Sequence, residues 1–150
     1  SLAQREAFWN FRETLPEMQK PEGASIKHDI SVPIAAIPAF IERADEAVRS
    51  VSPGARVVCF GHMGDGNLHY NISRPESGDD AAFLALYKPM NKAVHDVVRS
   101  FGGSISAEHG IGQLKREELI ATAPPVAIEL MRRVKAAFGP AGIMNPGKVI

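Results

Sequence analysis

The amino-acid sequence predicts an α+β fold in which helices cover one face of an antiparallel sheet. Three observations predict it: apolar residues that alternate along short segments, apolar residues three and four positions apart along longer ones, and the order of these segments. After a first helix over residues 2–19, the order is strand, helix, strand, strand, helix, strand. This is the split β-α-β arrangement of a ferredoxin-like sandwich, and it leaves the other face of the sheet open.

The four antiparallel strands are expected near residues 25–32, 55–62, 67–73 and 103–107. In the first of them, Ile26 and Ile30 alternate with Lys27 and Asp29, so the two pairs point to opposite faces of the sheet. His28 shares the apolar side and is interpreted as a core or interface histidine. Lys27, on the polar side, is interpreted either as an exposed strand charge or as a residue that binds a substrate carboxylate.

Two long helices are expected at residues 33–51 and 80–101, and a further helix is expected to begin near residues 124–125. Pro16 should end or kink the first helix of the chain, because proline lacks the N–H that a helix interior needs. His95 falls between the apolar positions of its helix and is expected to be solvated. Four apolar residues of the last helix are expected to point inward: Leu130, Met131, Val134 and Phe138.

The composition excludes several classes of protein. The 150 residues carry 17 basic and 17 acidic side chains, so the net charge of zero argues against electrostatic binding to nucleic acid. No apolar run reaches the length of a membrane span, and the amino-terminal segment is too polar for a signal peptide. Cys59 is the only cysteine, so an internal disulfide is excluded; its apolar neighbours indicate a buried small hydrophobic residue in a reducing compartment.

Two histidines flank a tight turn in the segment GHMGDGNLHYN, residues 61–71. If Asp65–Gly66 is a two-residue turn, His62 lies opposite His69 on the same face, with Cβ atoms about 4.5–5.5 Å apart. Two imidazoles placed in this way can bind one metal ion, and Asn71 follows on the same face. The alternative is that the two polar residues flank a turn and face water.

The segment SAEHGIG, residues 106–112, adds a carboxylate and a third imidazole. Because adjacent side chains at a strand end diverge, Glu108 is expected to complete a His-His-carboxylate set that suits Zn²⁺, Mn²⁺ or Fe²⁺. His109 would then be free for proton transfer near neutral pH. The alternative is that Glu108 caps the helix that follows.

Three segments together, GHMGDGNLHYNI, SAEHGIG and GIMNPGKVI, resemble the carboxyl-terminal domain of FAD-linked oxidases. The resemblance is to the group that contains D-2-hydroxyglutarate dehydrogenase, D-lactate dehydrogenase and the glycolate oxidase FAD subunit, and it covers nearly the whole chain. It implies that residues 1–150 form a ferredoxin-like cap domain, which binds substrate over a flavin held by an amino-terminal FAD-binding domain. That domain is absent from this chain, so we expect the chain by itself to be catalytically silent.

The resemblance also implies the roles of individual residues. It implies that His62, His69 and Glu108 bind a divalent metal, Zn²⁺ or Mn²⁺, and that His109 is the general base.

For the substrate, the resemblance implies that Arg12 and Lys27 hold carboxylates and that Asn71 lies near the reacting molecule. It also places Asn145 in a terminal segment near the flavin. One position departs from the pattern: a threonine that binds substrate in the hydroxyglutarate enzymes aligns by spacing with Pro16, which puts the second substrate carboxylate in doubt.

The activity implied is FAD-dependent oxidation of a D-2-hydroxy acid, D-2-hydroxyglutarate or D-lactate, to a 2-keto acid. Electrons would pass to an electron-transfer flavoprotein or a quinone, in a cytoplasmic protein with at most a peripheral attachment to the inner membrane. One alternative is the same reaction on D-lactate or glycolate. The other is a non-catalytic ferredoxin-like metal-binding or regulatory module, which the candidate ligand set disfavours because structural zinc usually has four ligands, often cysteines.

Overall fold

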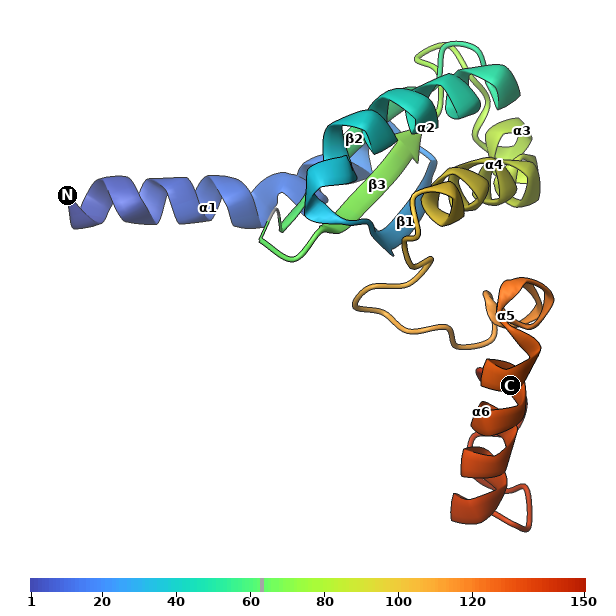
Figure 1. Ribbon diagram of the computed structural model, residues 1–150. Coiled ribbons are helices and arrows are strands. Elements are labelled where there is room, and N and C mark those ends of the chain that lie inside the picture. The colour runs from blue at the N-terminus through green and yellow to red at the C-terminus, as the bar shows by residue number, and fades with distance from the viewer. Residues whose placement is uncertain (63) are drawn as a thin grey trace. The chain divides into compact units, whose positions relative to one another are not determined.

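The computed structural model describes residues 1–62 and 64–150, apart from the side chain of Pro16 (Figure 1). They form two compact units, Ser1–Glu108 and His109–Ile150. The first contains an antiparallel sheet and most of the helices, which confirms the predicted α+β class. None of the described helices is both long and apolar enough to cross a membrane.

The sheet of the first unit has three strands: β1 (Ser25–Ser31), β2 (Arg56–His62) and β3 (Asn67–Ser73). Their order is β1-β3-β2, so the hairpin strand β3 lies in the centre and pairs antiparallel with both neighbours. The three strands lie where the alternating pattern predicts them.

The fourth strand, expected at 103–107, does not form. A single antiparallel bridge joins Ser104 to Ser31, with the two N–H to carbonyl bonds at 3.0 and 2.8 Å. The bridge lies on the free edge of β1, where the split β-α-β arrangement places its fourth strand. The segment therefore lies beside β1, where the predicted fourth strand would be, but it pairs with β1 through one residue pair only.

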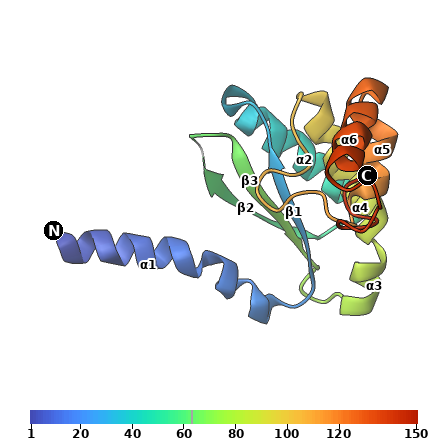
Figure 2. The same ribbon diagram turned by 90° about the horizontal axis from the view of Figure 1, so that it is seen from below.

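Two helices, α2 (Ile37–Val51) and α4 (Tyr87–Ser100), contact one another on one face of the sheet (Figures 1 and 2). A short 3-10 turn, η2 (Ile34–Ala36), precedes α2. The core between the helices and the sheet is formed by buried side chains from β1, β3, α2 and α4: Ile26, Ile30, Phe40, Ala44, Val48, Tyr70, Ile72, Met90, Val94 and Val98.

The helix expected over 80–101 is broken into two. Helix α3 (Asp80–Ala85) ends before α4 begins, and Leu86 between them leaves the helical conformation. Pro89 explains the break, because its ring clashes with the carbonyl four residues earlier, at Ala85, and it has no N–H to bond that carbonyl.

His95 of α4 is only 1% exposed, so the expectation that it is solvated is wrong. Its ring contacts the edge of His28, with ring centroids 5.3 Å apart. His28 lies in the core, as predicted, and its Nδ1 is 3.0 Å from the carbonyl oxygen of Tyr70. The buried face of α4 is thus wider than its stripe of apolar residues suggests.

The first helix, α1 (Leu2–Met18), extends away from the sheet (Figures 1 and 2) and leads through the 3-10 turn η1 (Lys20–Glu22) into β1. The helix continues past Pro16, which was expected to end or kink it. The proline costs one hydrogen bond to the carbonyl of Arg12 close to the helix end, and the helix tolerates this loss.

The second unit contains α5 (Arg116–Thr122) and α6 (Pro125–Phe138), and α6 begins where the sequence predicts. The apolar stripe of α6 was expected to face inward, but its residues are exposed. The exposed fractions are 54%, 36%, 57% and 77% for Leu130, Met131, Val134 and Phe138 respectively. Two helices and a terminal loop offer too little surface to cover this stripe.

Candidate functional site

The β2–β3 hairpin positions both histidines, but not in the expected register. His62 pairs with Asn67, and His69 pairs with Phe60. Met63 lies outside the described residues, and Leu68 pairs with Gly61.

Strand β2 ends at His62 and β3 begins at Asn67, so more than two residues separate the strands. The N–H of Val32 donates to the carbonyl of Gly66 at 3.1 Å, and the N–H of Gly66 donates to the carbonyl of His62, also at 3.1 Å. The carboxylate of Asp65 accepts from the N–H of Asn67 at 3.0 Å. These bonds hold the loop in its wider form.

The register differs from the expected one by two residues, so every side chain keeps its face. His62 and His69 still share a face, which is the face opposite the helices. Cross-strand pairing adds Asp29 beside His69 and Lys27 beside Asn71 on this face.

Glu108 reaches both histidines with its carboxylate. Oε1 lies 3.4 Å from Nδ1 of His62, and Oε2 lies 3.7 Å from Nε2 of His69. Glu108 does not cap a helix, because the next helix, α5, begins only at Arg116. Glu108 thus lies close to each histidine, while convergence of all three side chains on one point and metal binding by them stay predictions.

The donor types suit a divalent metal, although His62, His69 and Glu108 are not a group whose ligand atoms, one from each residue, all lie within 4.8 Å of one another in the described chain. An ion with bonds of about 2.1 Å in tetrahedral geometry holds its ligand atoms about 3.4 Å apart. Each of the two separations above is close to this value, but they involve different oxygens of Glu108. Two imidazoles and a carboxylate are ligands that Zn²⁺ and Mn²⁺ accept. A carboxylate oxygen of Asp29 also lies within 4.8 Å of a ring nitrogen of His69. The sequence placed Asp29 on this polar face, but no motif singled it out.

Arg12 of α1 contacts the same site through His62, with Nη2 2.6 Å from Nε2. Since a guanidinium only donates, Nε2 accepts, and the proton of neutral His62 is on Nδ1, which faces Glu108. A metal needs the lone pair of a deprotonated ring nitrogen. Metal binding by His62 therefore requires Arg12 to leave the ring.

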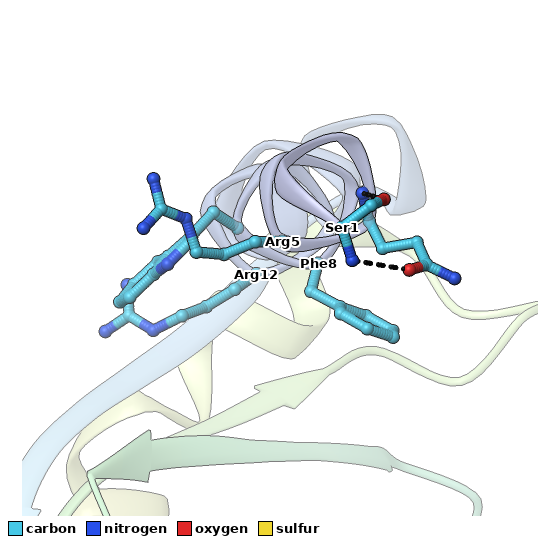
Figure 3. A pocket seen from close by; sticks show the side chains of 6 residues that line it. Ser1, Arg5, Phe8 and Arg12 are labelled. Atoms are coloured by element: carbon cyan, nitrogen blue, oxygen red, sulfur yellow. Dashed lines mark hydrogen bonds between the residues drawn. The ribbon is translucent and has the colours of Figure 1, made fainter.

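Arg12 also stacks over the ring of Trp9 at 5.3 Å from its centroid. Figure 3 shows Arg5 and Arg12 projecting from the same side of α1, in a hollow that is lined by this helix and its N-cap residue Ser1. The hollow includes none of the three convergent side chains. Arg12 thus lines the hollow and also contacts His62 of the candidate metal site.

Asn71 is buried, and its Nδ2 donates to Oε1 of Gln19 at 2.7 Å. Its Oδ1 has no hydrogen-bond partner within the described part of the chain. Lys27 beside it is exposed, as expected for the polar side of β1. Sequence reasoning missed Gln19, which lies just after α1 and carries no motif.

The remaining predicted residues belong to the second unit. His109 is its first residue and is exposed; the peptide bond keeps its Cα about 3.8 Å from that of Glu108. Asn145 is also exposed and has a φ angle of 45°, a left-handed conformation that asparagine tolerates better than most residues. Their roles in catalysis and flavin binding stay predictions.

Cys59 lies on the helix-facing side of β2, away from the candidate site, and is half-buried rather than buried as expected. Burial, and then the charge of Asp45, raise the pKa of its thiol to about 11. The thiol is therefore protonated at neutral pH, which agrees with a packing residue rather than a nucleophile or ligand.

Known proteins share this sequence pattern. The family model of FAD linked oxidases, C-terminal domain, matches residues 1–149. D-2-hydroxyglutarate dehydrogenase of Stutzerimonas stutzeri is 43% identical over 99% of this chain and 32% of its own length. The Xanthomonas citri enzyme is 39% identical over 99% of this chain and 31% of its own. The mitochondrial D-2-hydroxyglutarate dehydrogenase of Arabidopsis thaliana is 37% identical over 99% of this chain and 25% of its own.

The chain thus spans about a third or less of the length of these relatives. The family match covers both units of the structure, and the α+β fold agrees with it. The chain belongs to the C-terminal domain family of the FAD-linked oxidases.

Proposed function

We propose that this chain is the substrate- and metal-binding domain of an FAD-dependent enzyme that oxidises a D-2-hydroxy acid to a 2-keto acid. One observation carries the proposal: Glu108 meets His62 and His69 on the face of the sheet that the helices leave uncovered. The names of the relatives support D-2-hydroxyglutarate as the substrate.

The three candidate ligands favour a catalytic metal over a structural one. Structural zinc sites are closed by four protein ligands, whereas catalytic sites keep a position for water or substrate. The side chains of His62, 42% exposed, and Glu108, 43% exposed, would leave an ion bound there open to a small molecule.

The chain's own residues bind and orient the substrate in this proposal. Lys27 and Arg12 bind its carboxylates, and Arg12 becomes available when it leaves His62. Asn71 lies beside Lys27 and fixes the position of the reacting carbon. Two cationic side chains suit a substrate with two carboxylates, which favours D-2-hydroxyglutarate over D-lactate.

His109 takes the substrate's hydroxyl proton on a ring nitrogen. Bound FAD supplies a two-electron acceptor for the hydride from Cα, and a bound metal supplies a Lewis acid for the hydroxyl oxygen. The products would be a 2-keto acid, protonated His109 and a reduced cofactor. An electron-transfer flavoprotein or a quinone would reoxidise the enzyme, and its cytoplasmic location stays a prediction.

The test uses the full-length protein. D-2-hydroxyglutarate should bleach the flavin absorbance faster than D-lactate, and Glu108→Gln should lower both bound metal and the bleaching rate. Excess metal should partly restore the rate. The matched control is Glu129→Gln on α6, where the carboxylate accepts a hydrogen bond from Nε of Arg133 at 2.9 Å. A flavin that stays oxidised with every D-2-hydroxy acid would favour the non-catalytic module instead.

A further inference from the structure

We infer that Asp29 is a positioning residue, which holds Glu108 between the two histidines by binding the backbone that carries it. The inference rests on the proposed metal site, but its structural part stands on contacts within the first unit.

Asp29 is a buried carboxylate in the middle of β1, with 3% of its surface exposed. Its Oδ2 accepts the N–H of Glu108 at 2.9 Å and the N–H of Ala107 at 3.2 Å. A buried carboxylate is costly unless donors satisfy it, and bonds from N–H groups to a charged oxygen are stronger than neutral ones. These two donors are therefore more than incidental contacts.

The location of the two donors explains why strand pairing stops. If the ladder that starts at Ser31 and Ser104 continued antiparallel, Asp29 would lie opposite Ser106. Instead, the side chain of Asp29 accepts the N–H groups of Ala107 and Glu108, which follow Ser106, so these groups do not pair with a strand backbone. The segment thereby leaves β1, and Glu108 is directed over the polar face of the sheet.

Asp29 also lies opposite His69 in the ladder between β1 and β3. Asp29 therefore lies beside His69 in the sheet and binds the backbone of Glu108. The carboxylate of Glu108 can approach both histidines because its main chain is held in place. Loss of this support should let Glu108 sample other positions, and partners of metal ligands typically contribute about 10–100-fold in metal affinity.

The test compares Asp29→Asn and Asp29→Ala in the full-length protein, with two measurements on each. The first is the dissociation constant for Zn²⁺, titrated into metal-free protein. The second is the hydrogen exchange rate of the backbone amides of Ala107 and Glu108. Asp29→Ala should weaken Zn²⁺ binding by about 10–100-fold and speed exchange at both amides. Asp29→Asn should do less, because its amide oxygen still accepts.

The matched control is Asp45→Asn. Asp45 also accepts a side-chain hydrogen bond, from the hydroxyl of Tyr70 at 2.6 Å, but on the helix-covered side of the sheet. This variant loses the same charge and should leave Zn²⁺ affinity unchanged, so a general loss of stability would not imitate the expected result.

Three results would overturn or redirect the inference. Wild-type exchange at both amides in Asp29→Ala would refute it. Weaker Zn²⁺ binding without faster exchange would also refute it and would indicate that Asp29 is a ligand itself. If the unchanged protein binds no Zn²⁺, the proposed metal site fails, while the exchange rates still decide whether Asp29 positions Glu108. If Asp29→Ala does not fold, Asp29→Asn decides by the same two measurements.

Discussion

Replacing Gly66 by alanine tests how the β2–β3 connection supports the candidate site. Gly66 has a φ angle of 77°, and a Cβ added there would lie 2.1 Å from the carbonyl oxygen of Val32. Left-handed backbone costs an L-residue about 1–2 kcal/mol. Relieving the contact should also break the bond from the Val32 N–H to the Gly66 carbonyl, worth about 0.5–1.5 kcal/mol. We therefore expect the free energy of unfolding to fall by roughly 1.5–3.5 kcal/mol.

Two other glycines separate these contributions. Gly102 has a φ angle of 69° and no atom within 4 Å of its added Cβ, so Gly102→Ala should show the backbone cost alone. Gly64, in the same loop as Gly66, also has open space around its added Cβ and is not among the glycines with positive φ. Gly64→Ala should change stability by less than about 0.5 kcal/mol.

The assay is urea unfolding followed by circular dichroism, with the slope of the transition checked for constancy. Because the N–H of Gly66 bonds the carbonyl of His62, Gly66→Ala should weaken metal binding as well. A stability for Gly66→Ala no lower than that of Gly102→Ala would refute the close approach of Val32 as the reason for this glycine.

Three further predictions concern the chemistry of the chain. In the full-length protein, His109→Gln should slow flavin reduction by about 10²–10⁴-fold with the metal retained, measured by stopped flow and metal analysis; loss of metal would contradict its role as a base. Arg12→Gln should raise the KM for the hydroxy acid without weakening metal affinity, because Arg12 competes with metal for His62; weaker metal binding would contradict this. Folding raises the pKa of Cys59 from 9.0 to about 11, so its contribution to stability is complete below pH 9 and is lost as pH rises towards 11. In Cys59→Ala, the free energy of unfolding measured in urea should fall less steeply between pH 9 and 11 than in the unchanged protein. An equally steep fall would mean that other groups, such as Tyr70, cause the pH dependence.

The face on which each candidate residue lies was predictable from the sequence alone. Side chains alternate along a strand with a period of two, so the pattern around Ile26 and Ile30 assigned Lys27 and Asp29 to the polar face. The same period explains why His62 and His69 share a face although their predicted pairing was wrong. A register change of two residues moves partners along the strand but never across the sheet.

Local chemistry also contained a signal that the helical pattern concealed. Pro89 lies inside the apolar stripe of residues 80–101, and the clash of its ring with an earlier carbonyl is a property of the chain itself. The break at Leu86 was therefore predictable, whereas the continuation of α1 past Pro16 depends on a helix end that tolerates one missing bond.

Only the tertiary structure decided which distant groups meet. The wider loop depends on Val32 bonding Gly66, and the loss of the fourth strand depends on Asp29 accepting two amides from 107 and 108. His95 is buried because α4 packs against the sheet beside His28, not because of its own helical position. Periodicity describes one segment at a time, but these bonds join segments far apart in the chain, and their partners are set by three-dimensional packing.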